Sequence, residues 1–295
     1  MSLVEVAISR MRQAGAAKKE VDAGARTPAA AEPPAAPATE AAPSIKRLSI
    51  EIGMLRAKGY LPEESADRQF ADHYRQIKRP LIEKALSGQF EGPSDSRLIM
   101  VTSALPGDGK TFTSINLALS IARERDVTAL LVDADTPKPH VSQIFDLQGR
   151  PGLMDALVDE ARNIESLVVP TNIRGLSLLP AGTPVEGTAE LINSDRMRQL
   201  IMNLISNNPR RIVILDSPPL LITSESRALA KIAGQILLVV RAGHTPRHAV
   251  RDAITLFGEQ QAGGIVLNQG HAGFTENYYG YGAYGTESDD SAPKH

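Results

Sequence analysis

The sequence predicts an α/β fold whose mostly parallel sheet is covered by helices on both faces, the doubly wound arrangement. Apolar segments typical of buried strands alternate with helical segments between residues 97 and 268. Uninterrupted apolar strands indicate a parallel sheet, because parallel strands are usually buried on both faces. A glycine-rich turn also joins the first strand to the helix that follows it. A chain of 295 residues can hold one such domain together with extensions.

The predicted elements follow from the apolar runs and from helical spacing. Short runs rich in Val, Ile and Leu predict strands at 97–102, 128–133, 167–169, 176–180, 211–216, 235–241 and 264–268. Longer segments with apolar residues at helical spacing predict helices at 62–88, 110–125, 152–158, 188–205 and 224–231, with one more beginning near Pro246. Because helices and strands alternate along the chain, each helix is expected to connect two parallel strands.

The chain is expected to have four segments. Residues 1–20 predict a short amphipathic helix, which is either a docking element or a frayed, solvated helix. Residues 21–45 are expected to form a disordered linker rich in Ala and Pro, whose prolines block a continuous helix. The folded domain is expected to span 46–270. Residues 271–295 predict a flexible, Tyr-rich tail.

Composition excludes several functional classes. The net charge of −2 favours neither nucleic acid nor an anionic membrane as partner, so no nucleic-acid binding is expected. The absence of cysteine excludes disulfides, thiolate metal sites and cysteine nucleophiles. No apolar run approaches the ~18 residues of a spanning helix, and the first residues lack the layout of a secretory signal. The sequence therefore predicts a cytoplasmic protein.

The turn S-A-L-P-G-D-G-K-T, Ser103 to Thr111, has the composition of a loop that wraps nucleotide phosphates, as in the P-loop NTPases. Successive backbone N–H groups surround the β-phosphate, and the N-terminus of the following helix adds a favourable dipole. Lys110 is expected to reach the β and γ oxygens. The alternative is an ordinary strand–turn–helix connection. Residues expected to bind ATP are Pro106, Gly107, Asp108, Gly109, Lys110, Thr111, Phe112 and Asn268.

Three carboxylates follow apolar strands in patterns that suit Mg²⁺ and proton transfer. Asp133 and Asp135 end the run L-L-V-D-A-D, and the carboxyl ends of parallel strands form the ligand crevice of an open sheet. Asp216 ends I-V-I-L-D-S-P-P and matches a second carboxylate supporting Mg²⁺. The alternative for Asp133 and Asp135 is a helix cap, and the alternative for Asp216 is a core strand with a terminal cap. Asn268 is interpreted as contacting adenine, or else as a turn asparagine.

Tyrosines are concentrated near the end of the chain. Of six tyrosines, four lie in the segment N-Y-Y-G-Y-G-A-Y-G, where glycine resists ordering. Exposed tyrosines with flexible flanks suit adhesive contacts with other molecules, stacking on nucleic acid, or modification at the hydroxyl. The alternative is a low-complexity tail without a function. The four are Tyr278, Tyr279, Tyr281 and Tyr284.

Several motifs together resemble the bacterial tyrosine kinases of exopolysaccharide loci, which share a superfamily with the chromosome-partitioning and division-site ATPases. The motifs are A-L-P-G-D-G-K-T, L-L-V-D-A-D, G-L-M-D-A-L, L-L-P-A-G-T, I-V-I-L-D-S-P-P-L-L, L-L-V-V-R-A-G-H-T and G-I-V-L-N. The resemblance runs from about Arg75 to the C-terminus, and the tyrosine cluster separates the kinases from their ATPase relatives. The subgroup that looks most similar is the stand-alone kinase encoded beside polysaccharide chain-length regulators in exosortase-associated loci.

The resemblance implies an autokinase that uses ATP and Mg²⁺ and phosphorylates the tail tyrosines of a neighbouring subunit. Lys110, Asp133 and Asp135 would be catalytic, and Thr111, Asp133 and Asp216 would hold the metal. It also implies a ring-like homo-oligomer, regulation of exopolysaccharide synthesis or export, and a membrane chain-length regulator as the activator that recruits the kinase to the inner membrane.

The sequence departs from the family pattern at a few positions. Pro137 stands where the family usually has arginine, so Lys138 is the alternative phosphate contact. Ala104 replaces the first glycine of the phosphate loop. A partial match to the charged interface helix of the family, or else a solvated helix face, comprises Asp72, Arg75, Lys78 and Arg79.

Two other functions compete with the kinase. A nucleotide-switched positioning or partition ATPase shares the fold and the ATP motifs, but its additional signature lysine is replaced here by Leu105. A catalytically idle scaffold for polysaccharide assembly is the third hypothesis, and the intact Lys110 and carboxylates count against it. Tyrosine phosphorylation distinguishes the kinase from both.

Overall fold

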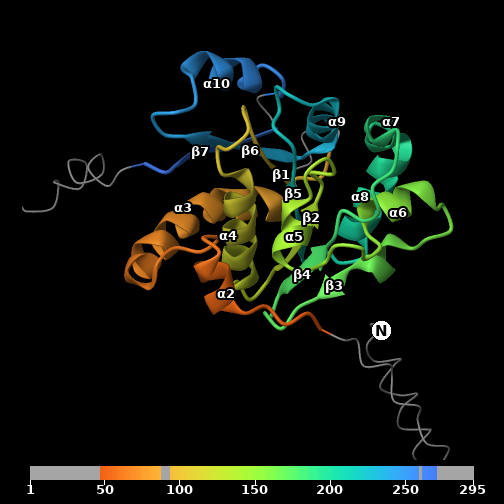
Figure 1. Cartoon of the computed structure of the whole chain (residues 1–295), viewed down its shortest axis with the longest axis horizontal. Coiled ribbons are helices and arrows are strands. Elements are labelled where there is room, and N and C mark those ends of the chain that lie inside the picture. The colour runs from red at the N-terminus through yellow and green to blue at the C-terminus, as the bar shows by residue number, and fades with distance from the viewer. Residues whose placement is uncertain (1–46, 88–93, 259–260, 271–295) are drawn as a thin grey trace, which may run out of the picture. The chain divides into compact units, whose positions relative to one another are not determined.

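A seven-stranded sheet organises the part of the chain that the computed structural model describes, residues 47–87, 94–258 and 261–270 (Figure 1). The order is β3-β4-β2-β5-β1-β6-β7, and every neighbouring pair is parallel except β3 with β4. The predicted, mostly parallel α/β sheet is confirmed. The strands are β1 Leu98–Ser103, β2 Thr128–Asp133, β3 Val169–Pro170, β4 Leu176–Leu179, β5 Arg211–Asp216, β6 Gln235–Arg241 and β7 Ala262–Asn268.

Helices connect the strands and cover both faces of the sheet (Figure 1). The α-helices are α2 Ile52–Ala57, α3 Asp67–Leu86, α4 Lys110–Ala122, α5 His140–Ile144, α6 Leu153–Val158, α7 Thr188–Ile192, α8 Asp195–Ser206, α9 Ser224–Ile232 and α10 Arg247–Ile254. Short 3-10 helices in the same ranges are η1 Glu64–Ala66 and η2 Ile164–Leu167.

The structure corrects several predicted bounds. The strand expected at 167–169 is wrong in its first part, because η2 occupies its start and β3 has only two residues. The single helix expected at 188–205 is two helices, since Ser194 accepts a hydrogen bond from the backbone of Met197 and starts α8 anew. The helix expected at 62–88 covers a shorter span, α3, and continues through Pro80. The sequence pattern did not predict α2 or α5.

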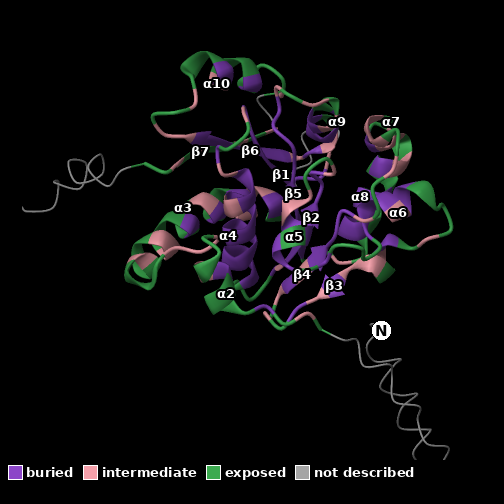
Figure 2. Cartoon of the chain, in the orientation of Figure 1, coloured by how far each residue is buried: buried purple, intermediate pink, exposed green. Residues whose placement is uncertain are grey.

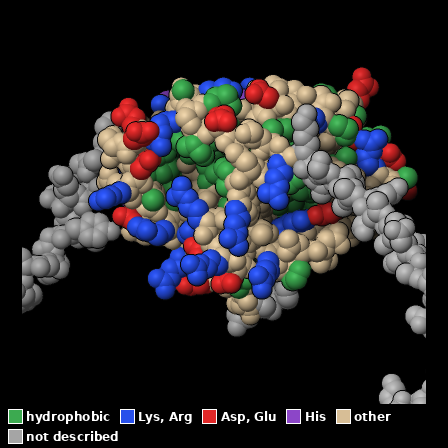
Figure 3. All heavy atoms as spheres, turned by 90° about the horizontal axis from the view of Figure 1, so that it is seen from below, with side chains coloured by type: hydrophobic (Ala, Val, Ile, Leu, Met, Phe, Trp, Pro, Cys, Tyr) green, Lys and Arg blue, Asp and Glu red, His purple; other side chains and the backbone are tan. Residues whose placement is uncertain are grey.

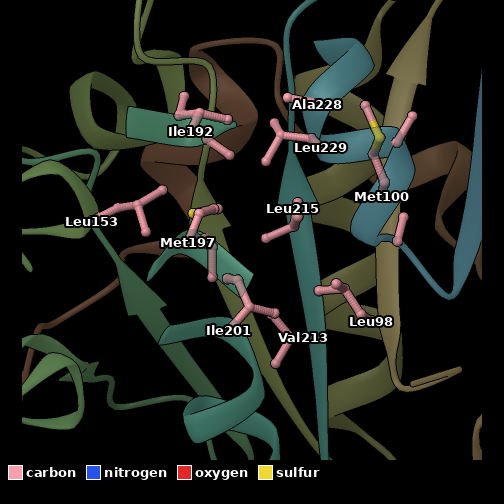
Figure 4. Packing of buried hydrophobic residues seen from close by; sticks show 14 of the residues in the cluster. Leu98, Met100, Leu153, Ile192, Met197, Ile201, Val213, Leu215, Ala228 and Leu229 are labelled. Carbon is pink, nitrogen blue, oxygen red and sulfur yellow. The ribbon is translucent and has the colours of Figure 1, made fainter. Parts of the chain in front are cut away.

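The sheet separates two hydrophobic cores, because successive residues of a strand point to opposite faces. Leu98 and Met100 of β1 pack with residues of α6, α8 and α9 (Figure 4). Ile99 and Val101 of the same strand pack on the other face, with residues of α2, α3 and α4. Figure 2 shows the resulting buried centre, in which α4 and the middle strands are almost wholly inaccessible to solvent. The core therefore holds the carboxyl ends of β1, β2 and β5 in fixed positions.

Strand register brings the motif-bearing strands together. β5 lies between β1 and β2, and Asp216 is the register partner of both Val101 and Asp133. Because these strands are parallel and in register, their carboxyl ends meet at the same edge of the sheet. The loop from Ala104 to Gly109 begins at this edge and leads directly into α4. Three sequence motifs that are far apart in the chain thus converge in one place.

Charges of both signs are interspersed on the described surface. Figure 3 shows Lys and Arg side chains gathered on one face, with Asp and Glu side chains among them. Exposed ion pairs include Arg79 with Glu83 and Arg162 with Asp159. Such pairs contribute little to stability, because water screens them.

No helix within the described ranges is both long enough and apolar enough to cross a membrane. The predicted amphipathic helix at 1–20, the linker at 21–45 and the tail at 271–295 lie outside the described residues. These three assignments, and the domain bounds of 46–270, stay predictions.

Candidate active site

The phosphate loop needs two glycines for its backbone conformation. Gly107 and Gly109 have φ of +86° and +95°, values that residues with a Cβ rarely adopt. Gly109 is also the residue before α4, so the helix begins at Lys110 with its free N–H groups at the loop. A Cβ on Gly109 would lie 2.0 Å from Nδ2 of Asn268. The loop therefore has the curvature and the exposed N–H groups of an anion-binding site.

Lys110 points from the start of α4 towards the carboxylates. Its Nζ lies 2.6 Å from Oδ2 of Asp135, and both side chains are nearly buried. Asp135 follows β2, so this ion pair joins the phosphate loop to the second predicted motif. A buried ammonium group beside a turn of free backbone N–H groups is placed to meet an anionic ligand.

Asp216, at the end of β5, is fully buried and held by two hydroxyl groups of α4. Thr111 Oγ1 donates to Asp216 Oδ2 at 2.8 Å, and Ser114 Oγ donates to Oδ1 at 2.9 Å. Burial raises the pKa of Asp216 to about 6, while the charge of Lys110 and the two hydroxyl groups act in the opposite direction. The carboxylate thus contacts Thr111, the hydroxyl residue predicted from the sequence to bind Mg²⁺.

Asp133, at the end of β2, is also fully buried. The backbone N and the Oγ of Ser142 both donate to its Oδ2 at 2.7 Å, and its Oδ1 has no partner among the described residues. Burial, together with the charge of Asp216, raises the pKa of Asp133 to about 7 against the effect of Ser142. A carboxyl group with this pKa can exchange a proton near neutral pH.

Two residues that are distant in sequence hold the phosphate loop in place. Thr245 Oγ1 donates to Oδ1 of the buried Asp108 at 2.7 Å, and Asn268 Nδ2 donates to the carbonyl oxygen of Asp108 at 2.9 Å. Thr245 follows β6, and Asn268 ends β7. Asn268, which the sequence predicts to contact adenine, thus anchors the phosphate loop in this structure, and the adenine contact stays a prediction. Pro106 and Gly107 remain exposed at the loop.

A cavity of about 680 Å³ lies between α3 and β7, beside the phosphate loop. Phe112 and Asn268 line it next to the loop, and Phe70, Tyr74 and Ile77 line it from α3. Phe70 packs edge-on against Phe112, with 5.6 Å between the ring centres. A cavity with apolar and aromatic walls and an amide is suited to a flat heterocycle such as a nucleotide base.

The chemistry of the donors fits Mg²⁺ bound together with a nucleotide. The carboxylates and the Thr111 hydroxyl are oxygen ligands, which Mg²⁺ prefers, and the free Oδ1 of Asp133 is a buried atom that lacks a partner within the described chain. In that same part of the chain, no three His, Cys, Asp or Glu side chains form a dedicated metal site. Mg²⁺ commonly binds through one or two carboxylates plus phosphates, so this set is sufficient.

The structure brings together most of the predicted site. Lys110, Thr111, Asp133, Asp135 and Asp216 converge at one sheet edge. The predicted phosphoacceptor tyrosines at 278–284 lie outside the described residues.

The charged interface helix is only partly as expected. Lys78, predicted to lie on a charged face of α3, is buried, and its Nζ bonds Ser120 O and Glu124. Asp72, Arg75 and Arg79 remain exposed. The buried position of Lys78 follows from packing of α3 on α4, which the sequence pattern did not show.

Ser114, Ser142 and Thr245 are site residues that the sequence did not reveal. The sequence could have indicated Ser114, because it lies three residues after Thr111 and residues at this spacing share one face of a helix. Ser142 and Thr245 are separated in sequence from their partners and carried no such signal.

The fold and site define a nucleotide-binding protein with a P-loop. Residues 96–259, more than half of the chain, match the family described as AAA domain, and the chain belongs to this family. Tyrosine-protein kinase YwqD of Bacillus subtilis (strain 168) is 28% identical over 222 residues, covering 74% of this chain and 88% of YwqD. The succinoglycan biosynthesis transport protein ExoP of Rhizobium meliloti (strain 1021) is 34% identical over 188 residues, covering 63% of this chain.

The chain spans most of YwqD but only 23% of ExoP. Among solved structures, the kinase domain of VpsO is 29% identical, with a TM-score of 0.53 over 68% of this chain and 98% of that domain. Together these similarities make the chain a member of the bacterial tyrosine kinase family, as its motifs indicate.

Proposed function

We propose that the protein is an ATP-dependent protein-tyrosine autokinase that phosphorylates its own C-terminal tyrosines and thereby regulates exopolysaccharide synthesis or export. The observation that carries this proposal is the convergence of Lys110 and three carboxylates on a phosphate loop, in a chain whose final segment contains four tyrosines. YwqD, which is named a tyrosine-protein kinase, supports the kinase activity, and ExoP, which is named a succinoglycan biosynthesis transport protein, supports the role in exopolysaccharide synthesis or export.

The phosphates of ATP bind to the N–H groups of the loop at 106–111 and to Lys110. To reach the phosphates, Lys110 exchanges its contact with Asp135 for a contact with the β and γ oxygens. The lysine then stabilises charge that develops on the transferred phosphoryl group. The base of ATP occupies the cavity beside Phe112 and Asn268, whose amide faces both the loop and the cavity.

The carboxylates divide the remaining tasks. Thr111 and Asp216 would hold Mg²⁺, with the free oxygen of Asp133 also available to it, and the bound metal would neutralise negative charge on the phosphates. Asp133 accepts the proton of the attacking tyrosine hydroxyl, because its raised pKa of about 7 suits a base near neutral pH. The tyrosine oxygen forms a bond to the γ phosphorus, the bond to the bridging oxygen breaks, and ADP leaves.

Several partners belong to the proposal. Trans-phosphorylation of Tyr278, Tyr279, Tyr281 and Tyr284 requires a homo-oligomer in which the tail of one subunit enters the site of its neighbour. Exposed Arg75 and Arg79 of α3 are available for contact between subunits. A membrane polysaccharide chain-length regulator is the proposed activator, and it would recruit this cytoplasmic kinase to the inner membrane.

Intact-mass spectrometry of the purified protein with ATP and Mg²⁺ tests this function. We expect added phosphate groups that map to 278–284 in the wild type and are absent in Lys110→Met. A variant with all four tail tyrosines changed to phenylalanine is expected to bind ATP normally without gaining phosphate. If the wild type gains no phosphate, even with the cytoplasmic segment of a candidate activator, the nucleotide-switched ATPase becomes the better hypothesis.

A further inference from the structure

Ser142, on α5, makes the two hydrogen bonds that orient the Asp133 carboxylate. Its backbone N and its Oγ each lie 2.7 Å from Oδ2 of Asp133. Ser142 is only 3% exposed and Asp133 is fully buried, so water does not replace these bonds. Oδ2 therefore has two donors, while Oδ1 has no partner among the described residues.

The direction of the Ser142 hydroxyl is fixed by a third residue. The backbone N of Ala181 donates to Ser142 Oγ at 3.0 Å. A serine hydroxyl has a single proton to donate and also accepts hydrogen bonds. Because Ser142 Oγ accepts from Ala181, its own proton is directed at Asp133 Oδ2.

The loop that contains Ala181 is itself attached to a neighbouring helix. Met154 N donates to Ala181 O, and Asp155 Oδ2 accepts from the backbone N of both Gly152 and Thr183. These bonds attach the loop after β4 to the first turn of α6. Hydrogen bonds thus connect α6 to the loop at Ala181, Ala181 to Ser142, and Ser142 to Asp133.

We propose that Ser142 is a positioning residue for phosphoryl transfer, which makes Oδ1 the oxygen of Asp133 that takes part in the reaction. This inference rests on the proposed kinase function. Without the hydroxyl, Oδ2 keeps only one donor, and the carboxylate can rotate so that its two oxygens exchange places. Partners that orient a functional carboxylate or metal ligand in this way commonly affect activity 10- to 100-fold.

The test compares Ser142→Ala with Ser226→Ala, a matched control. Ser226 is also a fully buried serine, but its hydroxyl bonds Thr223 and backbone carbonyls rather than a carboxylate. Three quantities are measured: the single-turnover rate of autophosphorylation at saturating ATP and Mg²⁺, the dissociation constant of ADP without Mg²⁺, and the thermal midpoint.

We expect Ser142→Ala to slow phosphoryl transfer about 10- to 100-fold and to change the ADP dissociation constant less than about twofold. Ser226→Ala is expected to transfer phosphate at nearly the wild-type rate, even with a similar loss of thermal stability. Ser142→Thr, which keeps the hydroxyl, is expected to restore most of the rate.

Each contrary result has a distinct meaning. Wild-type transfer rates in Ser142→Ala would overturn the positioning role and leave the kinase function intact. If Ser142→Ala and Ser226→Ala slowed phosphoryl transfer equally, the slowing would come from a general loss of stability. That result would also overturn the positioning role of Ser142. A wild type that gains no phosphate would overturn the proposed function and this inference together.

Discussion

Asp133 and Asp216 are register partners on the neighbouring parallel strands β2 and β5, so two fully buried carboxyl groups end adjacent strands. Burial raises the pKa of both groups, and the charge of Asp216 adds to the effect on Asp133. Neighbouring groups with raised pKa values are typical of functional sites, where a ligand supplies the compensating charge. Without that ligand, ionisation of both groups at the sheet edge is unfavourable.

The two buried carboxyl groups are expected to make stability depend on pH in the nucleotide-free protein. Their folded pKa values, about 7 and about 6, lie above the ordinary value of 3.8. Because the folded state holds these protons more tightly than the unfolded state, the contribution to stability is fully present below pH 3.8. It is lost as the pH rises through the folded pKa values, about 6 and about 7.

Asp133→Asn removes one of the two groups. The stability of this variant is therefore expected to fall less steeply than that of the wild type between about pH 4 and pH 7. Thermal unfolding across that range measures the effect. Asp126→Asn, at an exposed position before β2, is the control and should keep the wild-type slope. Parallel curves for Asp133→Asn and the wild type would contradict the prediction.

Lys110→Met is expected to abolish autophosphorylation and to weaken ATP binding at least about 100-fold, because the phosphates lose the ammonium group that lies at the start of α4. Calorimetric titration with ATP measures the affinity. Lys231→Met, at an exposed position on α9, should bind ATP as the wild type does. Normal affinity in Lys110→Met would disprove this role.

Gly109→Ala is expected to prevent tight nucleotide binding. The new Cβ would meet Asn268 Nδ2 at 2.0 Å, and a φ of +95° is strained for alanine. Adding Asn268→Ala removes the contact but not the strain, so it should recover binding only partly. Fluorescent nucleotide titration measures both variants. Gly53→Ala, in open space on α2, is the control for which binding should be unchanged.

Lys78→Met is expected to reduce the free energy of unfolding by about 1–3 kcal/mol. The change removes a buried bond from Nζ to Ser120 O and an ion pair with Glu124, which together attach α3 to the end of α4. Urea unfolding at fixed pH measures the change. Arg79→Met removes only an exposed pair with Glu83 and should stay within about 0.5 kcal/mol of the wild type.

The sequence predicted the alternation of strands and helices from local patterns. Short apolar runs indicate buried strands, and apolar residues at helical spacing indicate helices. It also located the phosphate loop, since the glycines at 107 and 109 are required by backbone conformation, which is a local property. The two wrong predictions were also local, namely the unbroken helix at 188–205 and the strand starting at 167. The break at Ser194 and the 3-10 turn before β3 depend on caps and packing, which hydrophobic periodicity does not indicate.

Consecutive residues encode the fold class, the phosphate loop and the three carboxylates, so all of these could be predicted without a structure. How they are held in place depends on contacts between distant segments. Thr245 and Asn268 bond Asp108 across 137 and 160 residues of chain, and Ser142, bonded by Ala181 of the loop after β4, donates to one oxygen of Asp133. Such contacts depend on strand order and register, which bring distant residues to one edge of the sheet and which no local pattern specifies.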